Sequence, residues 1–220
     1  MINIEERMPI AEKILSRAGS AIPGEIVEPK VDLAISHDNA ALVIKEFEKL
    51  GVELKLKPLL FIDHRFPAKS DGVAMGHKII REFAKRNGLK VLTEGICHQV
   101  AVERGFIRKG MFVVGFDSHS TICGALGAFG TGMGATDMAG IWATGRTWLR
   151  VPESILISIE GEPPFGVEAK DLALKMVKEI GSKGEKALQF SASMKLSDRM
   201  CIASMAAESG ALCAIFSSEV

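Results

Sequence analysis

The apolar residues of this 220-residue chain fall into two kinds of pattern. Helical spacing predicts helices over residues 11–18, 39–50, 73–86 and 168–181. In the second of them the core-facing positions are expected to be Leu42, Val43, Phe47 and Leu50. Short continuous apolar runs predict strands at residues 58–62, 90–96, 111–116 and 154–161. Strands that alternate with helices indicate an α/β fold with a largely parallel sheet.

The last part of the chain has the same character but stops abruptly. Residues 196–216 read as an apolar helix that carries the acid Glu208, followed by a strand with nothing after it. A connection near residue 152 is predicted to divide the chain into a first α/β domain, 1–152, and a second one, 153–220, which looks incomplete.

Glycines are concentrated between residues 124 and 145, which hold seven of the 22. Such a run permits tight turns or the packing of backbone against backbone. The series Gly130, Gly132, Gly134 lacks the third interval of a dinucleotide-binding loop, and no Gly-Lys-Ser/Thr of a phosphate-binding loop occurs. A nucleotide site is therefore not expected.

Charge and composition narrow the function classes. With 27 basic and 27 acidic residues, the chain lacks the positive excess of a protein that binds nucleic acid by covering phosphates. It has no apolar run of about 18 residues that would span a membrane, and residues 1–7 lack the apolar core of a secretory signal. A soluble, cytoplasmic protein is expected. Its four cysteines are widely spaced, form no Cys-x-x-Cys, and are expected to be small buried residues: Cys97, Cys123, Cys201 and Cys213.

The histidines are the first sign of chemistry. Three of the five follow predicted strands, in Asp63-His64, Cys97-His98 and Asp117-Ser118-His119, and ligands of parallel sheets bind beyond the carboxyl ends of the strands. A carboxylate that accepts from one ring nitrogen leaves the other nitrogen to transfer a proton.

A metal site is the rival interpretation of the same residues. His64, His98, His119 and Asp117 are ligands that suit zinc or iron, and the sequence does not separate a metal cage from an acid–base cluster. The remaining mid-helix histidine, His77, has no acidic neighbour and is predicted to be solvated surface.

Several strings, taken in order, resemble the aconitase superfamily, which includes aconitase, homoaconitase and 3-isopropylmalate dehydratase. They are DH at 63–64, GICHQ at 95–99, GFDSHS at 115–120, GALGAFGTGMG at 124–134 and ATGRTWLRVPE at 143–153. Together with GVEAKDLAL and MCIASMAAESGA further along, they extend the resemblance over essentially the whole chain, and they match the N-terminal half of the large subunit. The resemblance implies a three-layer α/β domain and the start of a second, related one.

The resemblance also implies a hydro-lyase. Such enzymes remove water from a hydroxy-di- or tricarboxylate and add it back with the hydroxyl moved by one carbon, using a 4Fe-4S cluster as Lewis acid. By position, Asp63 and His64 match the pair that protonates the departing hydroxyl.

Other site residues follow from the same match. His98 with Asp117, and His119 with Glu208, match two further histidine–carboxylate pairs, and Ser118 matches the serine of the site. His37 falls where the family has a polar residue that contacts substrate.

The chain departs from the family pattern in three ways. Ser120 replaces a threonine, Ser204 stands where aconitases have an asparagine, and none of the four cysteines matches a cluster ligand. No metal ligand is therefore assigned, and the family's substrate-binding arginines are expected from a separate small subunit, the swivelling domain.

Three hypotheses remain open at this stage. The chain is expected to be the N-terminal, truncated part of an isomerase of leucine- or lysine-type biosynthesis, inactive alone. The alternatives are a natural short protein that acts as a binding subunit completed by another polypeptide, and a self-sufficient histidine–metal hydrolase.

Overall fold

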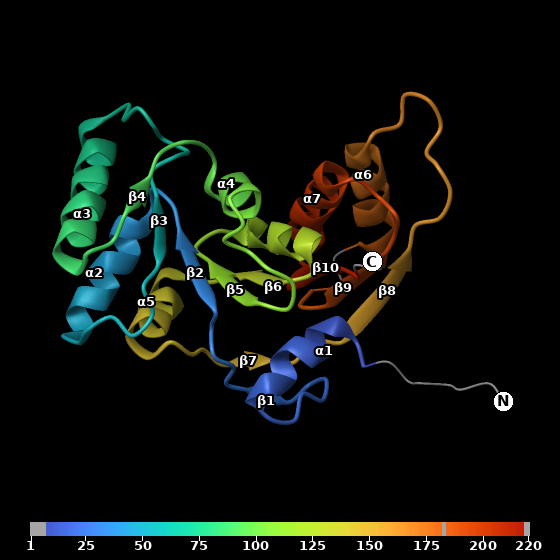
Figure 1. Ribbon diagram of the computed structural model, residues 1–220, viewed down its shortest axis with the longest axis horizontal. Coiled ribbons are helices and arrows are strands. Elements are labelled where there is room, and N and C mark those ends of the chain that lie inside the picture. The colour runs from blue at the N-terminus through green and yellow to red at the C-terminus, as the bar shows by residue number, and fades with distance from the viewer. Residues whose placement is uncertain (1–7, 182–183, 218–220) are drawn as a thin grey trace.

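The computed structural model describes residues 8–181 and 184–217, and its strands form two parallel sheets beside a short antiparallel pair (Figure 1). The first sheet has the order β4-β3-β2-β5-β6: β2 (Leu33–Ser36), β3 (Leu59–Phe61), β4 (Val91–Leu92), β5 (Phe112–Gly115) and β6 (Phe129–Gly132). The second has the order β10-β9-β8: β8 (Ser154–Ser158), β9 (Ala187–Ser191) and β10 (Cys213–Phe216). β1 (Ile26–Val27) pairs antiparallel with β7 (Leu149–Arg150). The predicted α/β class with a mostly parallel sheet is confirmed.

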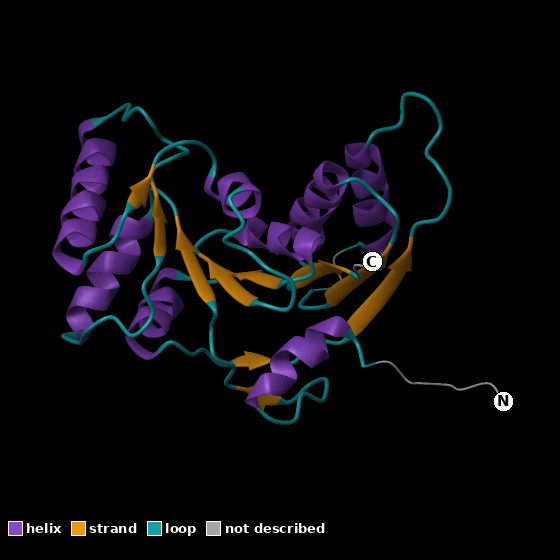
Figure 2. Ribbon diagram, viewed as in Figure 1, coloured by secondary structure: helices purple, strands orange, loops and turns teal. Residues whose placement is uncertain are grey.

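Helices cover both faces of the first sheet and make three layers (Figure 2). α2 (Ala40–Leu50), α3 (Asp71–Asn87) and α5 (Ala135–Thr144) lie on one face, and α4 (Cys97–Glu103) with the 3₁₀ helix η2 (Ser118–Leu126) on the other. Successive side chains of a strand point to opposite faces. Accordingly, Phe112 and Val114 of β5 belong to the core under α2, α3 and α5, while Val113 packs with α4 and η2.

The second sheet repeats the arrangement on a smaller scale. α6 (Ala169–Ile180) and α7 (Leu196–Met205) cover one face, where they enclose Leu188, Phe190 and Phe216. α1 (Ile10–Leu15), which continues into η1 (Ser16–Ala18), lies on the other side in Figure 2, and the amide of Ile10 donates to the Gln189 side chain at 2.8 Å. The 3₁₀ helix η3 (Ala206–Ser209) connects α7 to the turn before β10. Because Ile215 belongs to the core of the first sheet, the two parts share apolar packing.

The glycine run packs backbone against backbone, which was one of the two uses predicted for it. A side-chain carbon on Gly130 of β6 would lie 2.2 Å from the Ser120 carbonyl oxygen, and one on Gly124 would lie 1.4 Å from the Ala214 carbonyl oxygen. No side chain fits at these distances. The two glycines therefore let η2, which carries the DSH motif, lie directly on β6 and β10.

Several predicted elements differ from the observed ones. The core-facing positions of α2 include Val43 and Phe47, as expected, but Leu42 and Leu50 are about half exposed, at 52% and 49%. Only Val91 and Leu92 of the run 90–96 form a strand. Strands β1, β2, β6, β7 and β9 were not predicted. Neither were the helices α4, which begins at Cys97, and α5.

Three of the four cysteines are buried, as predicted, and Cys201 is partly exposed; all four are free thiols. In the described part of the chain, no helix has the length and apolarity needed to cross a bilayer. The expectation about a secretory signal rests on residues 1–7, which lie outside the described residues.

Candidate active site

Four histidines gather at the carboxyl end of the first sheet. His37 follows β2, His64 follows β3, His119 stands at the start of η2 after β5, and His98 is the second residue of α4. The ring centroids of neighbouring members lie 4.9 Å apart for His37 and His64, 5.7 Å for His64 and His98, and 6.2 Å for His98 and His119. The topology thus gathers into one row the three histidines predicted at strand ends and His37. We call them the histidine row.

Asp117 lies at the centre of the histidine row. Its carboxylate oxygens lie 3.1 Å from His119 Nδ1, 3.4 Å from His98 Nε2 and 3.6 Å from His37 Nε2. The backbone amide of His119 donates to the same carboxylate at 2.7 Å. Burial raises the pKa of Asp117, but this amide and the neighbouring imidazoles of His98 and His37 outweigh burial and lower it. Asp117 is therefore a carboxylate at neutral pH and shared by three imidazoles.

A second carboxylate, Asp63, holds His64. His64 Nδ1 lies 3.0 Å from Asp63 Oδ1, and the backbone amide of Cys97 donates to Asp63 Oδ2 at 2.6 Å. Burial raises the pKa of the Asp63 carboxyl, but the His64 side chain and the Cys97 amide outweigh burial and lower it to about 2. With Nδ1 facing a permanent carboxylate, Nε2 of His64 is the nitrogen left to exchange a proton.

His98 is held from both ring nitrogens. Nδ1 lies 3.5 Å from the Cys97 sulfur and Nε2 faces Asp117. Burial lowers the pKa of His98, and the nearby His64, His119 and His37 lower it further against the charge of Asp117. His98 is therefore a neutral imidazole at pH 7.

The third predicted pair joins the two parts of the fold. His119 Nε2 lies 3.4 Å from Glu208 Oε1, and Glu208 belongs to η3. All three histidine–carboxylate pairs expected from the family resemblance thus lie within 3.4 Å, while the roles of their members remain a proposal.

Ser120 and Ser204, at which the chain departs from the family pattern, take part in hydrogen bonds that involve the backbone. The Ser120 hydroxyl donates to the Asp117 carbonyl at 2.7 Å and so closes the first turn of η2. The Ser204 carbonyl accepts from the Thr121 hydroxyl at 3.4 Å.

The prediction that His77 is solvated surface is wrong. His77 is only 7% exposed, and its Nε2 lies 2.9 Å from Oδ1 of Asp38, a residue that the sequence analysis did not single out. The helical spacing of His77 with Ile80 and Ala84, both buried, was the signal that could have placed it on the inner face of α3. Asp38 follows β2, a strand that was not predicted.

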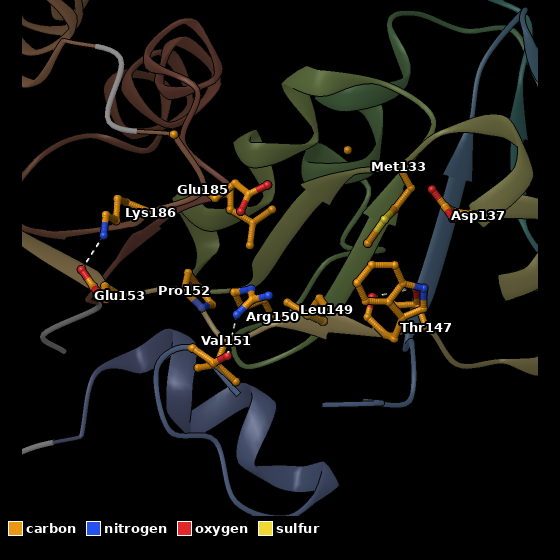
Figure 3. A pocket seen from close by; sticks show the side chains of 15 residues that line it. Met133, Asp137, Thr147, Leu149, Arg150, Val151, Pro152, Glu153, Glu185 and Lys186 are labelled. Atoms are coloured by element: carbon orange, nitrogen blue, oxygen red, sulfur yellow. Dashed lines mark hydrogen bonds and ion pairs between the residues drawn. The ribbon is translucent and has the colours of Figure 1, made fainter. Parts of the chain in front are cut away.

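Two hollows lie next to the histidine row, on the side of Asp117. The smaller, of about 480 Å³, is lined by Asp117 and Ser118, and it shares Gly132, Met133, Glu185 and Leu212 with a larger one of about 630 Å³ (Figure 3). In the larger hollow Lys186 is paired with Glu153, and Arg150 donates to the Gly24 carbonyl at 3.1 Å. Neither hollow is lined by a histidine among the described residues. Of the predicted site residues, Asp117 and Ser118 thus line one of these two hollows.

Two groups of side chains have the geometry of a metal site. One is His37, Asp38, Asp63 and His64, and the other is His64, His98 and Asp117; in each group the ligand atoms lie within 4.8 Å of one another. Within residues 8–181 and 184–217, no such group contains a cysteine. The donors present therefore suit a single divalent ion and do not fit the thiolate set of an iron–sulfur cluster.

Comparison with known protein families shows which family this chain belongs to. A family model described as the aconitase family (aconitate hydratase) matches residues 67–219. The chain belongs to the aconitase family. The family generally uses a 4Fe-4S cluster, and the histidine and aspartate donors gathered in the described residues do not fit that cluster.

Individual relatives give the same result. The chain is 45% identical to a 3-isopropylmalate dehydratase large subunit of Methanopyrus kandleri, over 92% of this chain and 52% of the relative. It is 42% identical to a probable methanogen homoaconitase large subunit of Methanothermobacter thermautotrophicus, over 93% and 53%, respectively. It is also 42% identical to a 3-isopropylmalate dehydratase large subunit of Thermotoga maritima, over 96% and 53%. The chain spans about half the length of the curated relatives it matches.

Proposed function

We propose that this chain supplies acid–base residues to a hydro-lyase that isomerises a hydroxy-di- or tricarboxylate, such as 3-isopropylmalate or homocitrate. One observation carries the proposal: the three histidine–carboxylate pairs that the family resemblance led us to expect lie together beside the carboxyl end of the sheet. The relatives' names, 3-isopropylmalate dehydratase and homoaconitase, support this choice of substrate class.

In the proposed reaction, a base takes a proton from carbon and the hydroxyl on the adjacent carbon leaves with a proton from His64. The products of this half-reaction are water and an unsaturated acid, and addition of water in the other orientation completes the isomerisation. Asp63 holds His64 through Nδ1, so that Nε2 is the proton donor. The base that accepts the carbon-bound proton is proposed to come from another polypeptide segment.

The other site residues have proposed supporting roles. Asp117 keeps the imidazoles of His98 and His119 oriented, and Glu208 fixes the second nitrogen of His119. Ser118, which lines the hollow beside Asp117, and His37, a member of the histidine row, are proposed to contact substrate.

The proposal includes partners. A small subunit with a swivelling domain would supply the arginines that bind the substrate carboxylates, and cluster-ligating cysteines would come from a segment outside this chain. On this proposal the 220-residue chain is inactive alone.

Complementation tests this function. The chain would be mixed with the segment of the Methanopyrus kandleri relative that it does not cover, and with the matching small subunit, after anaerobic iron and sulfide reconstitution. Formation of the unsaturated acid from 3-isopropylmalate or homocitrate, followed by its ultraviolet absorbance, is expected only in the complete mixture. Turnover by the chain alone would contradict the division of the site, and a complete, iron-loaded mixture that is inactive on both substrates would contradict the function.

A second candidate function is favoured by the metal geometry. His64, His98 and Asp117 have ligand atoms within 4.8 Å of one another, so a zinc-dependent hydrolase is the alternative. Metal analysis of the chain separates the two: one tightly bound zinc per chain with esterase activity would favour the hydrolase. The third hypothesis, a short binding subunit, predicts stable association with a partner but no gain of turnover in the mixture.

A further inference from the structure

Asp38 joins two elements of the site through one buried carboxylate. Oδ1 lies 2.9 Å from His77 Nε2, on α3. Oδ2 accepts the backbone amide of Arg65 at 3.2 Å and lies 4.0 Å from His64 Nδ1. The Asp38 side chain is 2% exposed, so these protein groups replace the water that an exposed carboxylate would bind.

His77 has the properties of a dedicated partner for this carboxylate. Its side chain is 9% exposed and comes from the inner face of α3, 39 residues from Asp38 in the sequence. A buried carboxylate is stable only when it is paired and hydrogen-bonded. The contact with His77 therefore fixes the position of Asp38, and Asp38 in turn fixes the main chain at Arg65.

His64 is the residue that needs such support. Its side chain is 37% exposed, more than that of His37 or His98, and Asp63 constrains it from one side only. The residue that follows it, Arg65, is the one whose amide Asp38 holds. The His64 ring thus faces Asp63, and the amide of the next residue donates to Asp38.

We propose that Asp38, held by His77, is a positioning residue for His64. Asp38 acts by holding the turn at Arg65 in place and by keeping the Nδ1 edge of the His64 imidazole directed toward the carboxylates. The effect on turnover rests on the proposed function, whereas the effect on the His64 ring does not. The competing explanation is that the Asp38–His77 contact only attaches α3 to the sheet, which would leave the ring of His64 unaffected when the contact is altered.

The unaltered chain provides the first test. Because the Arg65 amide donates to a buried carboxylate, its hydrogen exchange is expected to be at least about tenfold slower than that of exposed loop amides such as that of Gly161. Exchange of the Arg65 amide at the rate of those exposed amides would overturn the proposal. This measurement needs no variant and remains decisive if a substitution prevents folding.

Variants test the link to His64 directly. Asp38→Asn keeps the shape but removes the charge, and His77→Gln removes the imidazole; Asp71→Asn and Lys78→Gln, exposed positions of α3, are matched controls. The nitrogen-15 ring signals of His64 are expected to move toward a mixture of both tautomers in the first two variants and to stay in place in the controls. Unchanged His64 signals in a folded Asp38→Asn or His77→Gln chain would overturn the proposal.

The ratio of the changes in kcat and KM of the completed enzyme is a further measurement, because a purely structural role of Asp38 would not change kcat selectively. Asp38→Asn is expected to lower kcat about 10- to 100-fold with little change in KM, because the proton donor is misdirected while substrate contacts remain. An equal kcat in a folded variant would contradict the positioning role. If the unaltered mixture is itself inactive, the proposed function fails, and the ring signals of His64 still decide the positioning of His64.

Discussion

The site has two acidic centres, one formed by Asp63 and Asp38 and the other by Asp117, and they differ in their access to water. The side chains of Asp63 and Asp38 are 0% and 2% exposed, and backbone amides of Cys97 and Arg65 donate to them. The Asp117 side chain is 20% exposed, is shared by three imidazoles and lines a hollow. The first centre receives its hydrogen bonds from the protein, whereas the second can also receive them from solvent or a ligand.

This difference suggests that the buried centre maintains the structure of the site, whereas the open centre can bind water or a substrate. A dry carboxylate depends on each of its partners, so its substitution affects the folded structure. A carboxylate open to a hollow can replace a lost partner by water. We therefore expect changes at Asp63 to appear mainly in stability and changes at Asp117 mainly in chemistry.

The largest effect is expected from the proton donor that stands beside the dry centre. His64→Ala in the completed enzyme is expected to lower turnover about 100- to 10,000-fold, the usual contribution of a positioned acid. The fold should remain intact, because His64 is 37% exposed. Initial rates and circular dichroism of the variant check both parts. Near-normal turnover would show that His64 is not the proton donor.

The second effect compares the two carboxylates directly. Asp63→Ala leaves the buried Cys97 amide without its acceptor and removes the carboxylate that His64 faces, and it is expected to lower the free energy of unfolding by about 2–4 kcal/mol. Asp117→Ala, with water available, is expected to lower it by about 1 kcal/mol. Urea unfolding of both variants of this chain measures the difference. Equal losses would remove the distinction between a dry and an open centre.

A third, smaller effect is the loss of stability in acid. The pKa of His98 is lowered in the folded state from its ordinary 6.5, so protonation favours the unfolded chain and stability begins to fall as the pH drops below that value. The pKa of Asp63 is lowered from 3.8 to about 2, so its contribution is present above 3.8 and is lost between those two values. Thermal unfolding across this pH range should show both declines. His98→Gln should remove the upper decline, and Asp63→Asn should reduce the lower one, to which Asp117 also contributes because its pKa is lowered too. A flat profile between pH 7 and 5 in the unaltered chain would contradict the first.

The sequence predicted much of this arrangement because strand ends can be located from apolar runs. The runs before Asp63 and Asp117 correspond to β3 and β5, and parallel strands necessarily place their carboxyl ends on one edge. The contact between His119 and Glu208 could not be obtained in that way. It depends on how the second sheet packs on the first, and only the family resemblance indicated it.

The predictions failed where tertiary packing decides burial. His77 lies in a polar segment of α3 next to Lys78, yet its position on the inner face buries it. Its acceptor, Asp38, is distant in the sequence and follows a strand of only four residues, so no local pattern pairs the two. The glycines of β6 likewise concealed a strand, because their lack of side chains removes the apolar signal while permitting the close contact with η2.

The smallest effect concerns the thiols and tests how dry the Asp63 centre is. Burial raises the pKa of Cys97, and the nearby charge of Asp63 raises it further. Cys201, by contrast, is only partly buried. Because the thiolate is the reactive form, alkylation of the native chain is expected to modify Cys201 at least about tenfold faster than Cys97. Mass spectrometry of timed samples measures the order, and Cys201→Ser should remove the fast phase. If Cys97 reacted as fast as Cys201, water and reagent would reach the Asp63 centre, and the two acidic centres would no longer differ in the way that their exposures indicate.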